Sequence, residues 1–374
     1  MARPRILVVD DEPGMLRTIE RILSTRYDVR AVRLPSAGLA AADAGSFDVA
    51  ILDVRMPEMD GFALMARLGE RQPDLDVIMM TGSTDERDAR LIRAIREKAF
   101  FFLTKPFDRE VLLTLVQRCL EARRLSRENR AHLSRLESEL RAAQIFQQSL
   151  LPARTASLNG FEIEFVYEPC DELGGDFCDY VLREGCPGAI LVSDVSGHGA
   201  SSAMITGMVK QAFHAAVQEN YAPASVLTRI ADASQLFPDG KYVTAIAVRL
   251  EPESPEIEYA SGGHPPAFLR KPDRSTVRLD ADTYLLGVCE EADYCAECKT
   301  VPFGPGDALL AYTDGATEAR NLSGEMFNVE GLHTRIKEFA GAPARWPQSL
   351  LHQIVGYRRG PAEDDTLLVS IYRV

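Results

Sequence analysis

The feature of this sequence that most constrains its fold is a long run without helix breakers. Residues 108–151 contain neither glycine nor proline, and Pro152 ends the run. Apolar or small side chains recur there every three or four residues, the spacing of one face of an α-helix. These positions are Leu112, Leu115, Cys119, Ala122, Ser126, Asn129, Leu133, Leu136, Leu140, Ala143, Gln147 and Leu150. The pattern predicts one helix over residues 108–150, about 65 Å long at 1.5 Å per residue.

Such a helix divides the chain and leaves an apolar seam that must be buried. The seam follows a heptad spacing and is clearest at residues 133–140, as in a coiled coil. Its partner would be the same helix of a second subunit or, alternatively, the domains of its own chain. We expect a homodimer joined through this linker helix, and a division into residues 1–120, a linker over 108–152, and residues 153–374.

The N-terminal part alternates short apolar stretches with helical patterns. Strands are expected at residues 6–9, 49–52, 77–80 and 100–103, and helices at residues 14–23 and 61–68. Nearly continuous apolar strands separated by helices indicate a parallel sheet covered on both faces. The reactive site of such a sheet forms at the carboxyl ends of its strands.

Polar residues stand at those strand ends, namely Asp10, Asp11, Asp53, Thr81 and Lys105. Three carboxylates at one edge would repel one another unless they held a divalent cation, and Mg²⁺ prefers oxygen ligands with few protein groups. Asp53 would then act as a carboxylate nucleophile toward a phosphoryl group. The Thr81 hydroxyl and the Lys105 charge would contact the phosphoryl oxygens.

Residues 1–120 resemble the receiver domain of response regulators. The resemblance rests on four motifs: Val9-Asp10-Asp11-Glu12, the run DVRMPEMDG from Asp53 to Gly61, Thr81-Gly82, and Lys105-Pro106-Phe107. It implies a five-stranded, parallel, doubly wound sheet whose Mg²⁺ is bound by Asp11, Asp53 and the carbonyl of Arg55, with Asp10 acting through water. It also implies a cis peptide bond at Lys105-Pro106, an aromatic switch at Phe102, and a sensor histidine kinase as partner.

After Pro152 the sequence changes to β-branched and aromatic stretches separated by glycine and proline turns. Strands are expected at residues 161–167, 189–192, 243–250, 308–312 and 366–372, and helices at residues 200–219, 223–236, 329–339 and 346–357. Strands and helices that each come in runs suggest an α+β layered sandwich.

Acidic residues in this part lie within glycine turns. The four turns are Gly174-Gly175-Asp176, the run DVSGHG from Asp194 to Gly199, Thr313-Asp314-Gly315, and the run EDDT from Glu363 to Thr366. The glycines let backbone and metal approach closely, and ligands that are all oxygen favour Mg²⁺ or Mn²⁺ over zinc. Two such ions can ionise a bridging water, which then attacks phosphorus in line.

Residues 145–374 resemble the SpoIIE-like branch of the PPM metal-dependent serine/threonine phosphatases. Supporting motifs are IFQQSLLP at residues 145–152, ASGGHPP at 260–266 and YTDGATEA at 312–319. The resemblance implies a PPM-type β-sandwich flanked by helices, with Asp176, Asp194 and Asp314 as the catalytic carboxylates. Asp194 would bridge two Mn²⁺ or Mg²⁺ ions, and the carbonyl of Val195 would bind one of them. The implied substrate is a phosphorylated anti-anti-sigma factor of the STAS type.

The last motif departs from this family. The family has Asp-Asp-x-Thr, and counting back from Thr366 puts Glu363 where the metal-binding aspartate should stand. Either Glu363 binds the metal with its longer side chain, or the register shifts and Asp364 does so. Two histidines also have two interpretations: His198 and His264 could be general acids or hydrogen-bonded turn residues.

Charge and composition exclude several classes of protein. Residues 151–374 carry 18 Lys+Arg against 32 Asp+Glu, which disfavours a nucleic-acid partner. No apolar run approaches the roughly 20 residues that cross a bilayer, and the N-terminus does not have the pattern of a secretory signal. We therefore expect a cytoplasmic protein that binds neither nucleic acid nor membrane. The seven cysteines are an odd number, which argues against a disulfide framework.

The alternative to an enzyme is a non-catalytic adaptor, regulated by phosphorylation, that binds a sigma factor or its regulators. Loss of the metal-binding carboxylates would mark that class. Because Asp176, Asp194 and Asp314 are all present, the sequence favours the phosphatase.

Overall fold

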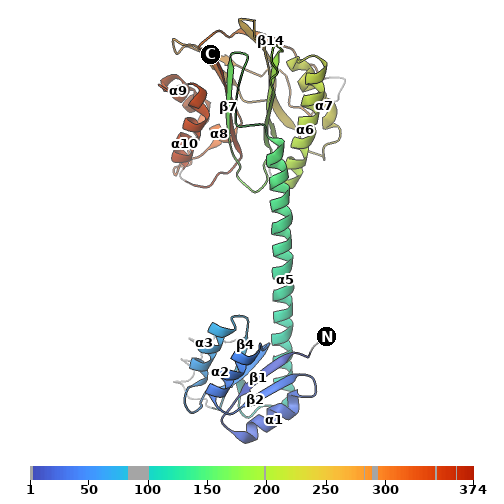
Figure 1. The fold of residues 1–374 in the computed structure, drawn as a ribbon, viewed down its shortest axis with the longest axis vertical. Helices are drawn as coiled ribbons and strands as arrows, with labels where there is room; N and C mark the ends of the chain where they lie inside the picture. The colour runs from blue at the N-terminus through green and yellow to red at the C-terminus, as the bar shows by residue number, and fades with distance from the viewer. Residues whose placement is uncertain are drawn as a thin grey trace. The chain divides into compact units, whose positions relative to one another are not determined.

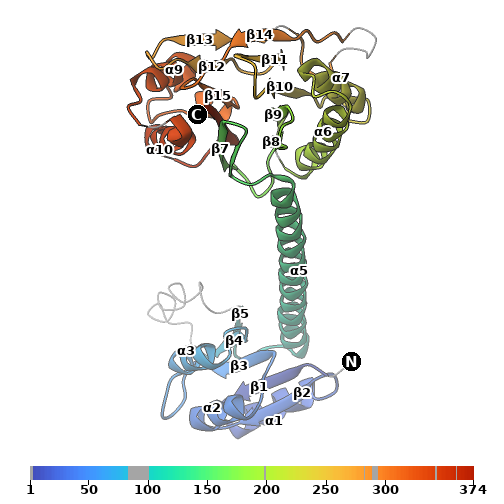
Figure 2. The same cartoon turned by 45° about the horizontal axis from the view of Figure 1, so that its top comes forward.

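The computed structural model describes residues 3–82, 101–197, 199–281, 283–288, 294–341, 343–358 and 360–374. The chain divides into two compact units, Met1–Leu136 and Glu137–Val374. Figures 1 and 2 show the helices and strands of each unit.

The first unit is built on a parallel sheet of five strands in the order β2-β1-β3-β4-β5. The strands are β1 (Arg5–Val9), β2 (Asp28–Val32), β3 (Val49–Asp53), β4 (Asp76–Thr81) and β5 (Phe101–Thr104). Described helices are α1 (Pro13–Leu23), α2 (Pro35–Ala44), α3 (Gly61–Arg71) and α5 (Arg109–Leu150). The apolar residues of α1 and α5 form one cluster with the sheet, and those of α2 and α3 form another. The expected doubly wound receiver fold is confirmed.

Strand β2 has no counterpart among the strands expected from the apolar pattern. Its sequence is Asp-Val-Arg-Ala-Val, and none of its five residues is fully buried. It lies at the edge of the sheet, where one side of the strand has no neighbouring strand to bury it. An edge strand of this kind lacks the continuous apolar run by which the central strands were identified.

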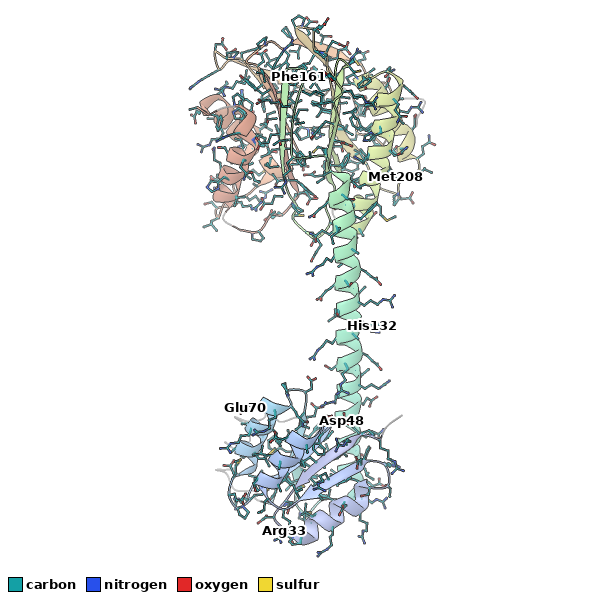
Figure 3. All side chains as sticks on the ribbon, viewed as in Figure 1. Arg33, Asp48, Glu70, His132, Phe161 and Met208 are labelled. Atoms are coloured by element: carbon teal, nitrogen blue, oxygen red, sulfur yellow. The ribbon has the colours of Figure 1, made fainter. Side chains whose placement is uncertain are left out.

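Helix α5 confirms the long helix predicted between the domains. Its first turns bury Leu112, Val116 and Cys119 in the core of the first unit. Farther along, Leu133 and Leu136 are more than half exposed, and Figure 3 shows the side chains around His132 projecting from the helix. The homodimer that would cover these leucines remains a prediction.

The second unit contains two antiparallel sheets packed face to face (Figure 1). One sheet has the order β14-β11-β10-β9-β8, and the other β13-β12-β15-β16-β7-β6. The strands are β6 (Thr155–Leu158), β7 (Phe161–Glu168), β8 (Asp176–Val181), β9 (Gly188–Val195), β10 (Val243–Leu250), β11 (Glu256–Gly262), β12 (Ala267–Arg270), β13 (Thr276–Leu279), β14 (Lys299–Pro302), β15 (Ala308–Tyr312) and β16 (Thr366–Arg373).

Helices cover the outer face of each sheet. The first sheet packs against α6 (Ala200–Glu219) and α7 (Pro223–Ser234), and the second against α8 (Gly315–Glu318), α9 (Asn328–Glu338) and α10 (Trp346–Arg358). Side chains such as Phe161 fill the space between the sheets (Figure 3). This layering confirms the expected β-sandwich flanked by helices.

Within the described ranges, no helix combines the length and the apolar character that a bilayer crossing requires.

Candidate functional sites

The first candidate site lies at the carboxyl edge of the parallel sheet. Asp10 follows β1 and Asp53 ends β3, and both side chains are buried. Carboxylate oxygens of Asp10, Asp11 and Asp53 lie within 4.8 Å of one another. The ammonium group of Lys105 lies 2.7 Å from Asp10 Oδ2 and 2.7 Å from Asp53 Oδ1. The structure therefore brings together the residues that the strand ends predicted.

The charges of this site are unbalanced. Burial raises the pKa of Asp53, as do the neighbouring Asp10 and Asp11, whereas Lys105 lowers it. Burial lowers the pKa of Lys105, but its hydrogen bonds to Asp10 and Asp53 outweigh this, so that its pKa is raised. One cation thus faces three carboxylates, and this set of oxygens fits a divalent cation of the magnesium type.

The remaining receiver residues lie at the same edge or close to it. Thr81 is buried at the end of β4, and the peptide bond between Lys105 and Pro106 is cis, as expected. Phe102 is half-buried on β5 and packs against the apolar cluster of α2 and α3. Arg55 lies in the turn after β3, beside Asp11 in a shallow pocket.

The second candidate site draws its carboxylates from both sheets of the sandwich. Asp176 begins β8 and stands opposite Asp194 of β9 in the antiparallel ladder. From the second sheet, Asp314 lies between β15 and α8, and Asp364 lies just before β16. Chain segments far apart in the sequence therefore meet at one end of the sandwich.

Backbone and hydroxyl groups hold these segments together. The Thr313 hydroxyl donates a hydrogen bond to Asp176 Oδ2 at 2.6 Å. Asp365 is buried, and its two carboxylate oxygens accept hydrogen bonds from the backbone amides of Cys170 at 2.8 Å and Gly175 at 2.6 Å. A side chain at position 175 would place its Cβ 2.3 Å from the carbonyl oxygen of Val195. Only glycine permits this close approach.

Burial and mutual repulsion perturb these carboxylates strongly. The pKa of Asp194 is raised to about 7 by burial and by the charges of Asp314, Asp364 and Asp365. The pKa of Asp314 is raised to about 6 by burial, Asp364 and Glu318. Asp176, which is buried and faces Asp194, has a pKa well above the ordinary value. A set of carboxylates that repel one another in this way is what divalent cations would neutralise.

The donor set fits magnesium or manganese. Asp176 and Asp194 pair on neighbouring strands, Asp314 and Asp364 act on Asp194 through their charges, and the carbonyl of Val195 approaches Gly175. These groups are all oxygen donors, which hard cations prefer. Cys170 Sγ lies within 4.8 Å of ligand atoms of Asp364 and Asp365. Burial and the charge of Asp365 raise the pKa of this thiol to about 12, and hard cations prefer oxygen over sulfur ligands.

The structure distinguishes Glu363 from Asp364. The Glu363 side chain is 77% exposed, and its Oε2 lies 4.0 Å from Arg320 Nε. Asp364 is among the charges that raise the pKa of both Asp194 and Asp314. The exposure of Glu363 and the position of Asp364 within 4.8 Å of ligand atoms of Cys170 and Asp365 favour Asp364 as the last carboxylate of the site, which is the second of the two alternatives that the sequence left open.

The structure describes one of the two candidate histidines. His198 lies outside the described residues. His264 is buried, and its Nδ1 lies 2.9 Å from the Thr244 hydroxyl oxygen. Burial lowers the pKa of His264 to about 3. His264 is therefore a neutral residue of the core at physiological pH, which suits the structural interpretation better than that of a general acid.

Two functional features escaped the sequence analysis. Asp365 stabilises the turn at Gly175 through backbone amides, and Gln147 of α5 is hydrogen-bonded to Gly174. The motif at residues 145–152 and the helical seam both contain Gln147, but neither indicated Gly174 as its partner.

Comparisons with known proteins agree with both units. Residues 188–374 match the family Stage II sporulation protein E (SpoIIE), and residues 6–117 match the response regulator receiver domain. Phosphoserine phosphatase RsbU of Bacillus subtilis is 25% identical over 191 residues, which cover 50% of this chain and 56% of RsbU. Transcriptional regulatory protein GlrR of Escherichia coli is 36% identical over 117 residues, which cover 31% of this chain and 26% of GlrR.

One solved structure supports the fold of the second unit. The SiaA-PP2C domain of Pseudomonas aeruginosa superposes with a TM-score of 0.57 at 20% sequence identity, covering 65% of this chain and 99% of that domain. The chain matches only about a quarter to just over half of the length of GlrR and RsbU.

Proposed function

Because the chain belongs to the SpoIIE family and carries a response regulator receiver domain, we propose that it is a two-component phosphatase. The second unit would remove phosphate from serine or threonine of a protein, and phosphorylation of Asp53 would control this activity. The observation that carries the proposal is the pairing of Asp176 with Asp194 on neighbouring strands, with Asp314 near enough for its charge to raise the pKa of both.

The proposed chemistry is direct hydrolysis. Two Mn²⁺ or Mg²⁺ ions, when bound, would supply an ionised water and screen the charge of the phosphate. Asp176, Asp194, Asp314, Asp364 and the carbonyl of Val195 would hold them. Thr313 would keep Asp176 in place through its hydrogen bond, and Asp365 would keep the Gly175 turn against Val195.

We also propose the partners. A sensor histidine kinase would phosphorylate Asp53, with Mg²⁺ held by Asp10, Asp11, Asp53 and the carbonyl of Arg55. Thr81 and Lys105 would then contact the phosphoryl group and Phe102 would change its packing. The substrate would be a STAS-type anti-anti-sigma factor, in keeping with the similarity to RsbU. These reactions take place in the cytoplasm, so we propose that location.

Dimerisation through α5 is the third part of the proposal. Leu133, Leu136 and Leu140 are 53%, 56% and 41% exposed and follow the heptad spacing. Burying such a seam in a parallel coiled coil would stabilise a dimer. Changing Leu136 and Leu140 to glutamate should convert the protein to a monomer in sedimentation velocity. Leu125→Glu is the matched control, because Leu125 is 54% exposed but lies off the seam. A monomeric wild type would contradict this part.

The catalytic proposal is tested by turnover. The full chain should hydrolyse p-nitrophenyl phosphate and a phosphorylated STAS protein in the presence of Mn²⁺, and Asp194→Ala should abolish both reactions. Asp239→Ala, at an exposed aspartate of the same unit, should leave them unchanged. A wild type that binds the STAS protein without turning over either substrate would instead be the non-catalytic adaptor.

Control by the receiver has its own assay. Turnover should change when acetyl phosphate is added to the wild type and should not change in Asp53→Asn. An unchanged wild-type rate, with Asp53 shown to be phosphorylated by mass spectrometry, would contradict control by the receiver and leave the catalytic proposal standing.

A further inference from the structure

The last turns of α5 contact a loop of the metal site through one side chain. Gln147 is half-buried, and its amide nitrogen donates a hydrogen bond to the carbonyl oxygen of Gly174 at 2.6 Å. Its amide oxygen accepts a hydrogen bond from the backbone amide of Gly174 at 3.2 Å. A single side chain thus binds both polar groups of one backbone residue, which fixes the orientation of that residue as well as its position.

Gly174 has little room to move away from this contact. It is buried, and a Cβ at this position would lie 1.9 Å from the hydroxyl oxygen of Tyr167 and 2.4 Å from Asp365 Oδ2. The backbone therefore lies directly against these two side chains. A shift of Gly174 toward these side chains is blocked. The hydrogen bonds to Gln147 oppose a shift in the opposite direction.

The residue after Gly174 is bonded to the metal site itself. The Gly175 amide donates to Asp365, and the Gly175 carbonyl accepts a hydrogen bond from the Val195 amide at 3.2 Å. Asp176 follows directly as the first residue of β8. A displacement of Gly174 would therefore move Asp176 and, through the hydrogen bond between Gly175 and Val195, also the residue whose carbonyl is the proposed metal ligand.

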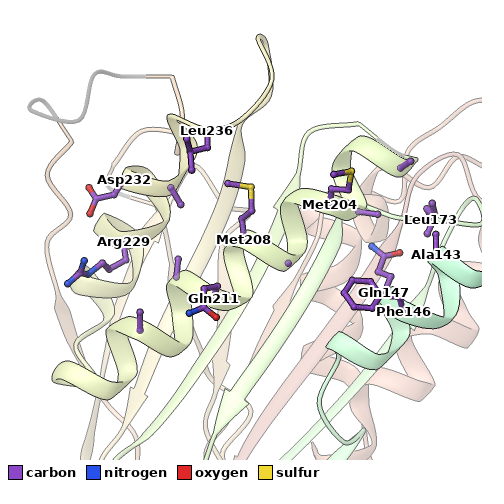
Figure 4. Close-up of a pocket in the computed structure, with 16 residues that line it drawn as sticks. Ala143, Phe146, Gln147, Leu173, Met204, Met208, Gln211, Arg229, Asp232 and Leu236 are labelled. Atoms are coloured by element: carbon purple, nitrogen blue, oxygen red, sulfur yellow. The ribbon is translucent and has the colours of Figure 1, made fainter.

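The surroundings favour the contact. Gln147 lies at a groove of about 890 Å³, whose lining is mostly apolar and includes Phe146 from α5 with Met204 and Met208 from α6 (Figure 4). Leu150, one turn farther along α5, packs against the apolar cluster under α6. These apolar contacts hold the last turns of α5 beside α6, at the place where Gln147 reaches Gly174.

We propose that Gln147 is a positioning residue for the metal site. It holds residues 174–176 in the conformation in which Asp176 and the Val195 carbonyl face the same cations. This rests on the proposed phosphatase function and names the residue through which α5 acts on the site. Because one residue of an α-helix corresponds to about 100° of rotation, a rotation or register change of α5 would remove both hydrogen bonds at once.

The test compares Gln147→Met with Gln148→Met in the full chain. Methionine keeps the length of the side chain and removes both hydrogen bonds, and Gln148 is an exposed neighbour on the same helix. In the metal-free protein, amide exchange at residues 174–176 should be at least about tenfold faster in Gln147→Met. Affinity for Mn²⁺, measured by calorimetric titration, should fall by about 10–100-fold, as is usual for residues that orient metal ligands. Gln148→Met should remain within about twofold of the wild type in both measurements, because the Gln148 side chain is exposed to solvent and exposed substitutions usually have small effects.

Equal exchange rates and equal Mn²⁺ affinity in the two variants would overturn the proposal. If Gln147→Met does not fold, Gln147→Glu carries the test, because glutamate keeps the acceptor for the Gly174 amide but loses the donor to its carbonyl. Wild-type Mn²⁺ affinity in Gln147→Glu would then overturn it. Neither measurement needs a substrate, so a wild type without turnover would count against the proposed function and not against the role of Gln147.

Discussion

Replacing Asp194 with asparagine should stabilise the metal-free protein while it removes the capacity to bind metal. Asp194 is mostly buried and stands opposite Asp176 on the neighbouring strand. Burial and the charges of Asp314, Asp364 and Asp365 raise its pKa to about 7. An ionised Asp194 is therefore unfavourable in the folded protein unless a cation is present, and asparagine removes this unfavourable charge.

The magnitude follows from the shift of the pKa. From 3.8 to about 7 is roughly three pH units at about 1.4 kcal/mol each, an upper limit of about 4 kcal/mol. The folded state binds more protons than the unfolded state between these pKa values, so stability falls as the pH rises from about 4 to about 7. At pH 8 the asparagine variant should thus be more stable by about 2–4 kcal/mol. For a unit of this size that corresponds to roughly 5–15 °C in melting temperature.

Differential scanning calorimetry of the full chain measures this effect. In a chelating buffer at pH 8, the transition of the second unit should occur at a higher temperature in Asp194→Asn than in the wild type. Asp239→Asn, at an exposed aspartate, is the matched control and should not shift it. Added Mn²⁺ should stabilise the wild type by about 2.7 kcal/mol at one hundred times its dissociation constant, and should have little effect on Asp194→Asn.

Two results would refute this reasoning. An unchanged or lower melting temperature for metal-free Asp194→Asn at pH 8 would mean that the carboxylates do not repel one another in the folded protein. An advantage of the variant that persists undiminished at pH 4 would mean that its origin is not the charge, because Asp194 is then protonated in the folded wild type.

Three further changes have defined outcomes. Gly175→Ala should lower the affinity for Mn²⁺ by about tenfold or more in a calorimetric titration, because the added Cβ would lie 2.3 Å from the Val195 carbonyl oxygen; wild-type affinity would contradict this. Asp53→Asn should abolish Mg²⁺-dependent labelling by radioactive acetyl phosphate, and residual labelling would point to another acceptor. Because burial lowers the pKa of His264 to about 3, protons favour the unfolded state as the pH falls below 6.5. Between pH 7.5 and 5 the wild type should lose about 2 kcal/mol through this group, and urea titrations of His264→Gln should lack that loss.

The receiver site follows from the sequence because its geometry is that of the sheet. Asp10, Asp53 and Thr81 end or follow parallel strands, and the carboxyl ends of parallel strands meet at one edge. A local pattern of apolar residues is therefore enough to place side chains that are far apart in the chain. The edge strand β2 was missed, but it carries none of these residues.

The phosphatase site is harder to derive from local patterns. Strand β8, which begins with Asp176, was not expected, because its sequence Asp-Phe-Cys-Asp-Tyr-Val contains two aspartates among six residues. The second of them, Asp179, is buried and bonded to Lys210 and His214 of α6. Only a partner more than thirty residues away makes this carboxylate compatible with a strand interior, and the apolar pattern carries no information about such a partner.

The roles of the two adjacent aspartates in the last motif also cannot be assigned from local sequence patterns. Asp364 and Asp365 are chemically identical and both raise the pKa of Asp194, yet Asp364 is exposed and Asp365 is buried with two backbone amides. These amides belong to Cys170 and Gly175, which precede Asp365 in the chain by 195 and 190 positions. Which aspartate has which role depends on how β16 aligns with its neighbours, and a count from Thr366 does not reveal that alignment.

The groups that hold the ligand loops differ in kind from the groups that would hold the metal. Thr313, Asp365 and Gln147 act through hydrogen bonds to a side chain or to backbone atoms, and these bonds do not require a cation. The loops are therefore shaped before metal binds, although the carboxylates they carry repel one another. In such a site the affinity for metal depends steeply on the spacing of the carboxylates, since their repulsion is large and unscreened. A signal that removes one of these hydrogen bonds could thus change metal affinity, and with it activity, while the sandwich remains folded.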